Sequence, residues 1–469
     1  MKRELFSSKI GFILAAAGSA VGIGNLVAFP VMASQNGGAA FLIMYAFFVF
    51  FICLPVMLAE MSLGRHTRQN PHGAYSKIGQ TPLWNGVGWL AVITPFMIGV
   101  FYLVITVWIF GYLAKAVMGQ LDTLAQDGAF GVFINSNELY IYMAVVIGLT
   151  FLILQSGVKQ GIERAATYLM PALFVMLLLL VGYVLTLDHA MLGVQFFLIP
   201  DFSKINVQVL TDSLAQAFFS LSLAMGILIT YGSYIQKNND IVGAGKMVAG
   251  LSLLVACCAG LLILPAVFWS DPSIDPSQLT DSSIGMIFMV LPKIFLALQQ
   301  DIGFFGASFV ASFFFLLVFF AAMTSLISII EVPVASLMDT KGISRRRSLV
   351  TLGVVMVALS VLSALSFGRV DWLTSFLSYG GADKSFFDVI MDVFYYSILP
   401  LNGLLLCLFV IYRWQKVNLH AEMREGNPGF EGSLMQKYID FSLGTFIPAI
   451  LAVIFLLNVL GRFFGVQFF

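Results

Sequence analysis

The stretch "GSAVGIGN", Gly18 to Asn25, interrupts an apolar run that extends from Ile10 to Met32. Three glycines, a serine and an asparagine are unusual there, because glycine disfavours a helix interior by about 1 kcal/mol relative to alanine. An unwound segment frees backbone carbonyl and amide groups, which protein, water or ligand must satisfy inside a membrane. We therefore expect this segment to be unwound backbone that faces an ion or a substrate.

The composition is that of a polytopic membrane protein. Of the 469 residues, 59% are hydrophobic and 10% are charged, and the mean hydropathy of +0.95 lies far above that of soluble domains. The first apolar run lacks a small-residue cleavage site before a polar region, so we interpret it as a retained span in the plasma (inner) membrane. The four cysteines all lie in apolar runs and predict no disulfide framework: Cys53, Cys257, Cys258 and Cys407.

Eleven apolar stretches are long enough to cross about 30 Å of hydrocarbon. They are 9–32, 38–63, 87–118, 139–155, 165–187, 209–235, 242–270, 304–338, 348–367, 387–412 and 438–461. Lysine and arginine gather in alternate loops, such as "GRHTRQNPHGAYSK" and "DTKGISRRR", and cationic loops stay in the cytoplasm. This pattern predicts a cytoplasmic amino terminus and a carboxyl terminus outside.

A second break, "SLSLAMG" from Ser220 to Gly226, lies five spans after the first. Because five is odd, a repeat of that length would insert its second copy upside down, as in inverted-repeat transporters with discontinuous helices. We therefore expect an all-α polytopic fold with an inverted five-helix repeat and broken helices 1 and 6. Helices 1–5 would occupy 1–190, helices 6–10 would occupy 208–412, and an eleventh helix would occupy 438–461. Close helix packing explains one glycine-rich span equally well, but two breaks with polar side chains favour a binding site.

A hydroxyl cluster in the eighth span, "FFAAMTSLIS", supports this interpretation. Ala321 and Thr324 share a helix face, so the Ala321 carbonyl and the hydroxyls of Thr324 and Ser325 can point at one small hard cation. The alternative is that these hydroxyls merely bond back to carbonyls of their own helix. The sequence contains no histidine-rich, cysteine-pair or HExxH pattern, so we expect no other kind of metal site.

Five stretches together resemble the neurotransmitter:sodium symporter family, and most closely its bacterial amino-acid-transporting members with eleven spans. They are "SKIGFILAAAGSAVGIGN", "FPVMASQNGGAAF", "SLGR", "QAFFSLSLAMGILITYGSY" and "FFAAMTSLI". The resemblance covers the whole chain and is strongest in spans 1, 2, 6 and 8. It implies a sodium-coupled symporter that imports an amino acid by alternating access and is not an enzyme.

The resemblance implies two sodium sites, of which at least one is expected to be occupied. The second site would use Gly18, Val21, Ala321, Thr324 and Ser325. The first site would use Ala20, Asn25, Ser220 and the substrate's carboxylate, and its seventh-span ligand, usually Asn or Asp, falls on Ser252. Chloride coupling is not expected, since Tyr45, Gln216 and Ser220 match the family's anion site but the seventh-span position is Ala256.

The resemblance also implies a substrate pocket. Its members would be Ala20, Gly22, Gly24, Ile98, Tyr102, Phe219, Ser222, Met225, Ser328 and Ile329. Gly22 stands where monoamine carriers place Asp and leaves room for an amino acid's own carboxylate, to which Tyr102 would donate its hydroxyl. The apolar members predict a neutral, hydrophobic amino acid.

Both gates can be assigned by the same resemblance. In "NLVAFP", Ala28 replaces the arginine that normally pairs with an aspartate of span 10, here Asp392 or Asp388. We expect that carboxylate to be left unpaired, either facing water or meeting a polar or cationic group of the substrate. The inner gate would use Arg3, Asp339 and Tyr234. Further expectations are that the Gly161 to Pro171 spacing allows span 5 to unwind, and that Glu60 braces the broken helices.

Other functions fit less well. A channel needs a continuous polar lining, and an enzyme needs a nucleophile and base at membrane depth; the sequence offers neither. The open alternatives are a transport-impaired amino-acid sensor, or a carrier of a cationic or other amino-acid-like substrate with altered sodium coupling. The expected partners are the amino acid and the lipid bilayer, with no nucleic acid, and the expected state is a monomer or weak dimer.

Overall fold

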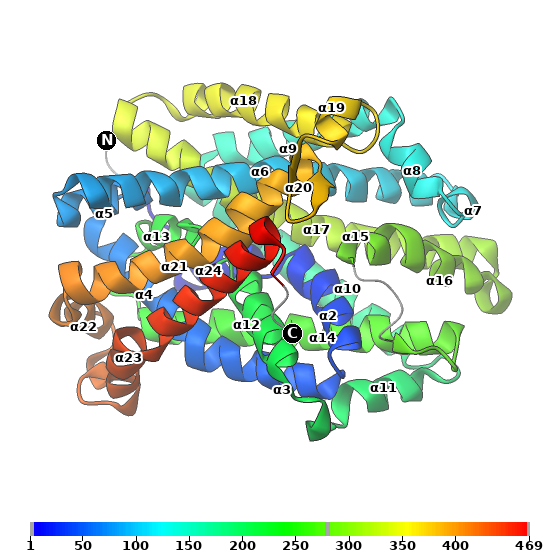
Figure 1. Ribbon diagram of the computed structural model, residues 1–469, viewed down its shortest axis with the longest axis horizontal. Helices are drawn as coiled ribbons and strands as arrows, with labels where there is room; N and C mark the ends of the chain where they lie inside the picture. Colours follow the sequence, from blue (N-terminus) through cyan, green and yellow to red (C-terminus); the bar gives the residue numbers. More distant parts are fainter. Residues whose placement is uncertain (1–3, 277–281, 467–469) are drawn as a thin grey trace.

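The computed structural model describes residues 4–276 and 282–466 and is dominated by helices (Figure 1). Two short strands, β1 (Leu377–Tyr379) and β2 (Ala382–Lys384), form an antiparallel hairpin in which Ser378 lies opposite Asp383. Within the described ranges, nine helices are long and apolar enough to cross a membrane, and one bent pair is a tenth. The all-α membrane architecture is confirmed.

The helical elements follow the expected spans, with η marking turns of 3-10 or π-helix. In the first half they are α1 (Lys9–Ala20), η1 (Gly24–Ala28), α2 (Phe29–Gln35), α3 (Ala39–Phe48), η2 (Val49–Cys53), α4 (Leu54–Thr67), α5 (Pro71–Gly79), α6 (Pro82–Val117), α7 (Leu121–Leu124), α8 (Ala129–Ile134), α9 (Glu138–Gln155), η3 (Val158–Glu163), α10 (Arg164–Val184), α11 (Ala190–Leu198) and η4 (Phe202–Lys204). In the second half they are α12 (Val207–Ser220), α13 (Ile227–Gly232), α14 (Ile241–Ser270), α15 (Ser283–Gly285), η6 (Met286–Val290), α16 (Leu291–Ala297), α17 (Gln299–Lys341), α18 (Arg345–Leu365), α19 (Asp371–Thr374), α20 (Phe386–Ile390), η7 (Met391–Ile398), α21 (Leu399–Leu408), η8 (Phe409–Trp414), α22 (Lys416–Arg424), η9 (Pro428–Phe430), α23 (Leu434–Gly444) and α24 (Phe446–Phe464).

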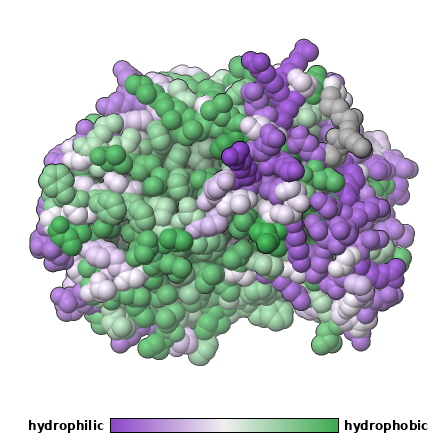
Figure 2. Space-filling view, turned by 180° about the vertical axis from the view of Figure 1, so that it is seen from behind, coloured by the Kyte–Doolittle hydropathy of each residue, from purple (hydrophilic) through white to green (hydrophobic). Residues whose placement is uncertain are grey.

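The long helices α6 and α17 pack against each other through the middle of the molecule. In Figure 1 they run along the long axis, with α5 and α22 at one end and α7, α8 and α16 at the other. The end with α5 and α22 carries the cationic loops that predict the cytoplasm, and we name it the inner end and the opposite one the outer end. Figure 2 shows a broad apolar surface whose hydrophilic side chains gather mainly at the inner end, as hydrocarbon contact requires.

Span 1 breaks within the expected segment. The hydroxyl of Ser8 accepts a hydrogen bond from the Gly11 amide and begins α1, which ends at Ala20. Val21 then leaves the helical region, with φ −104° and ψ 88°. The helical axis bends by 53° before it continues from Gly24. The backbone groups around the bend are therefore released from the regular helical ladder.

Span 6 breaks between α12 and α13, from Leu221 to Gly226, as the sequence predicts. Ser222 and Ala224 have φ of 52° and 62°, a conformation that costs residues with a Cβ about 1–2 kcal/mol each. The Glu60 carboxylate lies against the backbone amides of Ala224 and Gly226. The surrounding structure thus holds the break in place, and Glu60 contacts it from span 2.

The start of span 5 is tied to the segment that precedes α1. The Ser7 hydroxyl donates to the Glu163 carboxylate at 2.6 Å, and the Ser7 amide donates to the same carboxylate at 2.7 Å. In the opposite direction, the Val158 amide donates to the Glu4 carboxylate at 2.6 Å. Each segment therefore supplies a carboxylate to the other. Gly161 lies in the π-helical turn η3 between these contacts.

Candidate ion and substrate site

The hydroxyls of α17 face the end of α1. The Ser325 hydroxyl of α17 donates to the Gly18 and Ser19 carbonyls of α1, at 3.3 and 3.2 Å. The Thr324 hydroxyl bonds back to the Ala321 carbonyl at 3.0 Å, as Thr commonly does in a helix. A Cβ on Gly18 would lie 3.2 Å from the Cβ of Thr324, so glycine permits this approach. Clustered neutral oxygens of this kind suit a hard cation.

Four of the five residues assigned to the second sodium site thus lie together, namely Gly18, Ala321, Thr324 and Ser325. Val21 is the first residue beyond α1. Back-bonding alone accounts for Thr324 but not for Ser325, whose hydroxyl reaches another helix. The cluster therefore joins the break in span 1 to span 8.

A second group of oxygens surrounds Asn25, which is completely buried. Its side-chain amide donates to the Ser252 hydroxyl at 2.8 Å, and the Ser252 hydroxyl lies 3.4 Å from the Ala20 carbonyl. The side-chain carbonyl of Asn25 has no hydrogen-bond partner within the described ranges. A buried acceptor without a partner is costly, so this oxygen is suited to receive a cation.

The remaining first-site residue, Ser220, lies on the neighbouring helix α12. Its hydroxyl accepts from the Gln216 side chain at 3.3 Å, and that same amide donates to the Gly24 carbonyl at 2.7 Å. Gln216 therefore connects α12 to the break in span 1. The short neutral side chain of Ser252 takes part in this polar group through Asn25.

A small cavity lies between the two breaks, and eight of the ten residues assigned to the substrate pocket line it. These are Gly22, Gly24, Ile98, Tyr102, Phe219, Ser222, Met225 and Ile329. Ala20 and Ser328 are not among its lining residues: the Ala20 carbonyl lies near Ser252, and the Ser328 hydroxyl donates to the Ser325 carbonyl at 2.7 Å. The cavity is also lined by Ser19, Asn25, Ser220 and Ser325.

The polar end of the cavity has little room beside Gly22. A Cβ on Gly22 would lie 2.6 Å from the Ser325 hydroxyl oxygen and 2.9 Å from the Tyr102 hydroxyl oxygen. The Tyr102 hydroxyl accepts a long hydrogen bond of 3.5 Å from the Ile23 amide, so its proton is available to another acceptor. Ile98, Met225 and Ile329 are apolar. The cavity therefore has one polar end and apolar walls.

Two aromatic rings separate this cavity from one at the outer end. The Phe219 ring meets the Tyr395 ring edge-on, with centroids 4.6 Å apart. Beyond them lies the outer cavity, of about 310 Å³, whose lining includes Ala28, Ile105, Gln216, Tyr396 and Asn458. Gly24, Tyr102 and Phe219 line both cavities.

The expectation of an unpaired carboxylate at the outer gate is wrong for Asp392. Asp392 is 3% exposed and forms a salt bridge of 2.6 Å with Arg462 of α24. It also accepts from the Tyr379 hydroxyl at 2.9 Å. Asp388 is exposed and forms a capping box with Ser385 instead. The carboxylate is paired because the final helix brings a cation to it, which the local sequence around Ala28 does not reveal.

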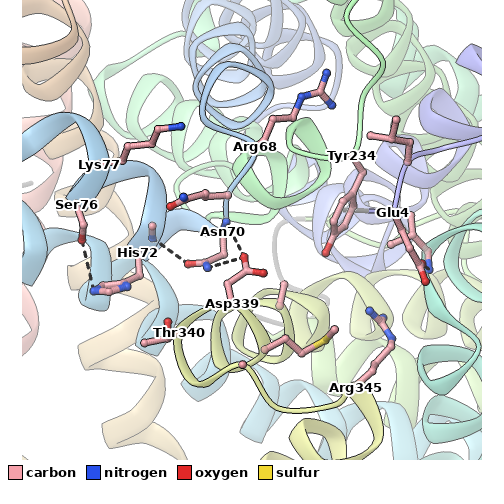
Figure 3. A pocket seen from close by; sticks show the side chains of 17 residues that line it. Glu4, Arg68, Asn70, His72, Ser76, Lys77, Tyr234, Asp339, Thr340 and Arg345 are labelled. Atoms are coloured by element: carbon pink, nitrogen blue, oxygen red, sulfur yellow. Dashed lines mark hydrogen bonds between the residues drawn. The ribbon is translucent and has the colours of Figure 1, made fainter. Parts of the chain in front are cut away.

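The inner end holds a cavity of about 1100 Å³ (Figure 3). The Asn70 side chain donates to Asp339 at 2.8 Å on one side of it. On the other side, the Tyr234 hydroxyl donates to Glu331 at 2.7 Å, and Arg345 forms a salt bridge with the same carboxylate. Arg3, assigned to the inner gate with Asp339, lies outside the described residues.

The inner loops also fix the arginine of "SLGR". Arg65 is buried and forms a salt bridge of 2.5 Å with Glu422 of α22. Burial opposes ionisation of Glu422, but the hydrogen bond from His66 and the charge of Arg65 outweigh it and lower the pKa of this carboxyl. The motif therefore anchors α4 to the loop that follows span 10.

Several functional candidates escaped the sequence analysis. Ser19 lines the substrate cavity, Arg345 pairs with Glu331, Glu163 binds Ser7, and Arg462 binds Asp392. Ser19 lies inside the quoted break and could have been found there. The charged residues form pairs between segments remote in the chain, and the sequence carried no signal for those pairings.

Comparisons with known proteins agree on one family. A family model described as the sodium:neurotransmitter symporter family matches residues 3–126 and 132–460. The sodium-dependent transporter YhdH of Bacillus subtilis is 34% identical over 462 residues, 97% of each chain. The human sodium- and chloride-dependent taurine transporter is 26% identical over 390 residues, 72% of this chain and 61% of that protein. A crystal structure of MhsT in complex with L-phenylalanine superposes with a TM-score of 0.83 at 37% identity, covering 97% of this chain and 99% of the other.

Proposed function

Because the chain belongs to the sodium:neurotransmitter symporter family, whose members are sodium-dependent membrane transporters, we propose that it imports a neutral, apolar amino acid together with sodium. The observation that carries this proposal is the cavity between the two helix breaks. It has backbone, hydroxyl and amide groups at one end and apolar side chains around the rest. A lining of this chemistry suits a zwitterion with an apolar side chain.

The two oxygen clusters would hold the sodium ions. In the second site, we assign the Gly18, Val21 and Ala321 carbonyls and the Thr324 and Ser325 hydroxyls as ligands. In the first site, the free side-chain carbonyl of Asn25 supports the assignment of Asn25, with Ala20, Ser220 and Ser252 as its neighbours. A substrate carboxylate beside Gly22 would lie near this site and couple amino acid to ion.

The substrate contacts would divide by chemistry. The Tyr102 hydroxyl and the amides freed by the span 1 break would bind the carboxylate, and carbonyls of both breaks would bind the ammonium. The resemblance to an L-phenylalanine complex supports an apolar amino acid. Ala20 and Ser328 would support the residues that line the cavity without contacting the substrate themselves.

A cationic substrate is less well supported. Its side chain would need a carboxylate, and Asp392 already binds Arg462 and Tyr379. Within the described ranges, the substrate cavity is lined by no Asp or Glu. A cation would therefore enter this cavity without a partner, at a large desolvation cost.

Transport would proceed by alternating access. We place the amino terminus in the cytoplasm, since the cationic loops lie at the inner end. The two inverted repeats, 1–190 and 208–412, would open the inner and outer cavities in turn, with helix 11 at 438–461 outside the repeats. We propose no chloride requirement.

Uptake into proteoliposomes tests this function. An inward sodium gradient should drive accumulation of a radiolabelled apolar amino acid such as L-phenylalanine, and replacing sodium by potassium should abolish it. In a panel of unlabelled amino acids, the neutral and apolar ones should reduce uptake of the labelled substrate. Sodium-dependent binding without accumulation would instead identify a sensor, and competition by lysine or arginine alone would identify a cationic carrier.

Met225→Phe should change which apolar amino acid is preferred. The larger ring would reduce the space for the substrate side chain while leaving the backbone groups that bind its ends. We expect the ratio of kcat/KM for a large over a small apolar substrate to fall roughly tenfold. Met247→Phe, on the exposed face of α14, is the matched control and should leave the ratio unchanged. An unchanged ratio in Met225→Phe would place the substrate side chain elsewhere.

A further inference from the structure

The last helix, α24, holds the outer part of span 10. Its Arg462 forms the 2.6 Å salt bridge with Asp392, and the guanidinium carbon lies 3.2 Å from the centre of the Tyr396 ring. One turn earlier, the Asn458 side chain donates to the Tyr396 carbonyl at 2.7 Å. Both contacts fall on the π-helical turn η7, whose backbone departs from the regular α-helical ladder. An arginine that stacks on an aromatic ring and binds a buried carboxylate is well fixed in position.

The hairpin β1–β2 fixes the end of α24 in turn. The Gly380 amide donates to the Phe463 carbonyl at 3.2 Å, and the Tyr379 ring stacks on the Phe463 ring. Gly380 has φ +62°, and a Cβ there would lie 2.2 Å from the Arg462 carbonyl oxygen. Tyr379 also donates to Asp392, so hairpin, α24 and η7 meet at one carboxylate.

This arrangement reaches the substrate cavity through one residue of η7. Tyr395, next to Tyr396, meets Phe219 edge-on and so separates the outer cavity from the substrate cavity. We infer that Arg462 is a positioning residue for outer closure: by holding η7 through Asp392 and Tyr396, it keeps Tyr395 against Phe219. The cation that holds the outer side closed thus comes from the last helix, and among residues 4–276 and 282–466 no ion pair involves a residue next to Ala28.

This inference rests on the proposed function, but cysteine labelling tests it without any transport. Ile98→Cys, the outer reporter, lines the substrate cavity behind the Phe219–Tyr395 ring pair, and Thr340→Cys, the inner reporter, lines the inner cavity. A membrane-impermeant maleimide would be applied to right-side-out vesicles for the outer reporter and to inside-out vesicles for the inner reporter, in sodium-free buffer. The parent protein with its native cysteines supplies the background, since none of the four is exposed.

Arg462→Gln should speed labelling at the outer reporter by roughly fivefold and leave the inner reporter unchanged. Asp392→Asn should also speed it, and the double variant should be slower than the product of the two single effects predicts, because both substitutions remove the same salt bridge. The control is Arg369→Gln, whose arginine binds Asn137 at 2.6 Å and lies over the Tyr140 ring but does not contact η7. It should change neither rate.

Two outcomes would overturn the inference. An unchanged outer rate in Arg462→Gln would show that the pair does not hold the closure. An equal rise at both reporters would show that Arg462 only stabilises the fold. If the parent fails to accumulate any amino acid, the proposed function fails, yet the labelling rates still decide the role of Arg462.

Discussion

Combining Thr324→Val with Ser325→Ala is expected to abolish sodium-dependent amino-acid binding while the protein still folds and inserts. A hydrogen bond or ligand contact to a charged group contributes about 1.5–3 kcal/mol, so losing two hydroxyls should weaken sodium binding roughly 10²- to 10⁴-fold. Valine keeps the shape of threonine, and the Ser325 contacts to Gly18 and Ser19 are the main ones lost to α1. Scintillation proximity binding of a labelled amino acid across a sodium titration measures this loss.

The matched control lies on the same helix. The Ser312 hydroxyl bonds back to the Ser308 carbonyl at 2.7 Å, remote from the break, so Ser312→Ala should leave the sodium titration unchanged. Size-exclusion chromatography of each variant reports folding. Sodium-stimulated binding that persists in the well-folded double variant would remove the second-site assignment.

Gly22→Asp is expected to reduce amino-acid transport to about 1% or less of the parent's. Its Cβ alone would approach the Ser325 and Tyr102 hydroxyls within 3 Å, and its carboxylate would occupy the space assigned to the substrate's own. A buried charge without a cationic partner costs several kcal/mol, and repulsion of the substrate carboxylate adds to this. Initial uptake rates in proteoliposomes, normalised to reconstituted protein, measure the effect.

Two alanine variants separate space from charge. Gly22→Ala introduces only the close contacts, both with the ends of side chains, and should retain part of the activity. Gly148→Ala in span 4 meets nothing within 4 Å and should behave like the parent. If Gly22→Asp transports normally, the substrate does not lie against the break in span 1.

The broken spans could be predicted because their signal is local. Glycine and polar side chains inside an apolar run oppose a continuous helix wherever they occur, and the structure breaks both spans at those residues. Gly22, Gly24 and Phe219 lie in or beside the breaks, whereas Ile98, Tyr102 and Ile329 could be assigned to the cavity only through the family resemblance. Ser328 lies behind the cavity while its neighbour Ile329 lines it. The sequence could not distinguish the two, because they lie in the same turn of one helix.

The charge pairing was not predictable from local sequence. Arg462 lies near the end of an apolar helix, where an arginine usually extends to the membrane surface. Only the packing of α24 against span 10 brings it to Asp392, 70 positions away. The same holds for Glu163, which reads as part of a cationic loop yet binds Ser7, 156 positions away.

The exchange of carboxylates between the segment before α1 and the start of span 5 bears on the fidelity of coupling. Glu163 binds Ser7 while the exposed Glu4 binds Val158, so full separation of the two segments breaks hydrogen bonds at both carboxylates. Breaking paired contacts in one event makes intermediate positions costly, as in any cooperative transition. We therefore expect the inner end to favour fully shut or fully open positions. A carrier that is either fully shut or fully open at this end has few partly open conformations. Sodium would then seldom flow down its gradient without a bound substrate.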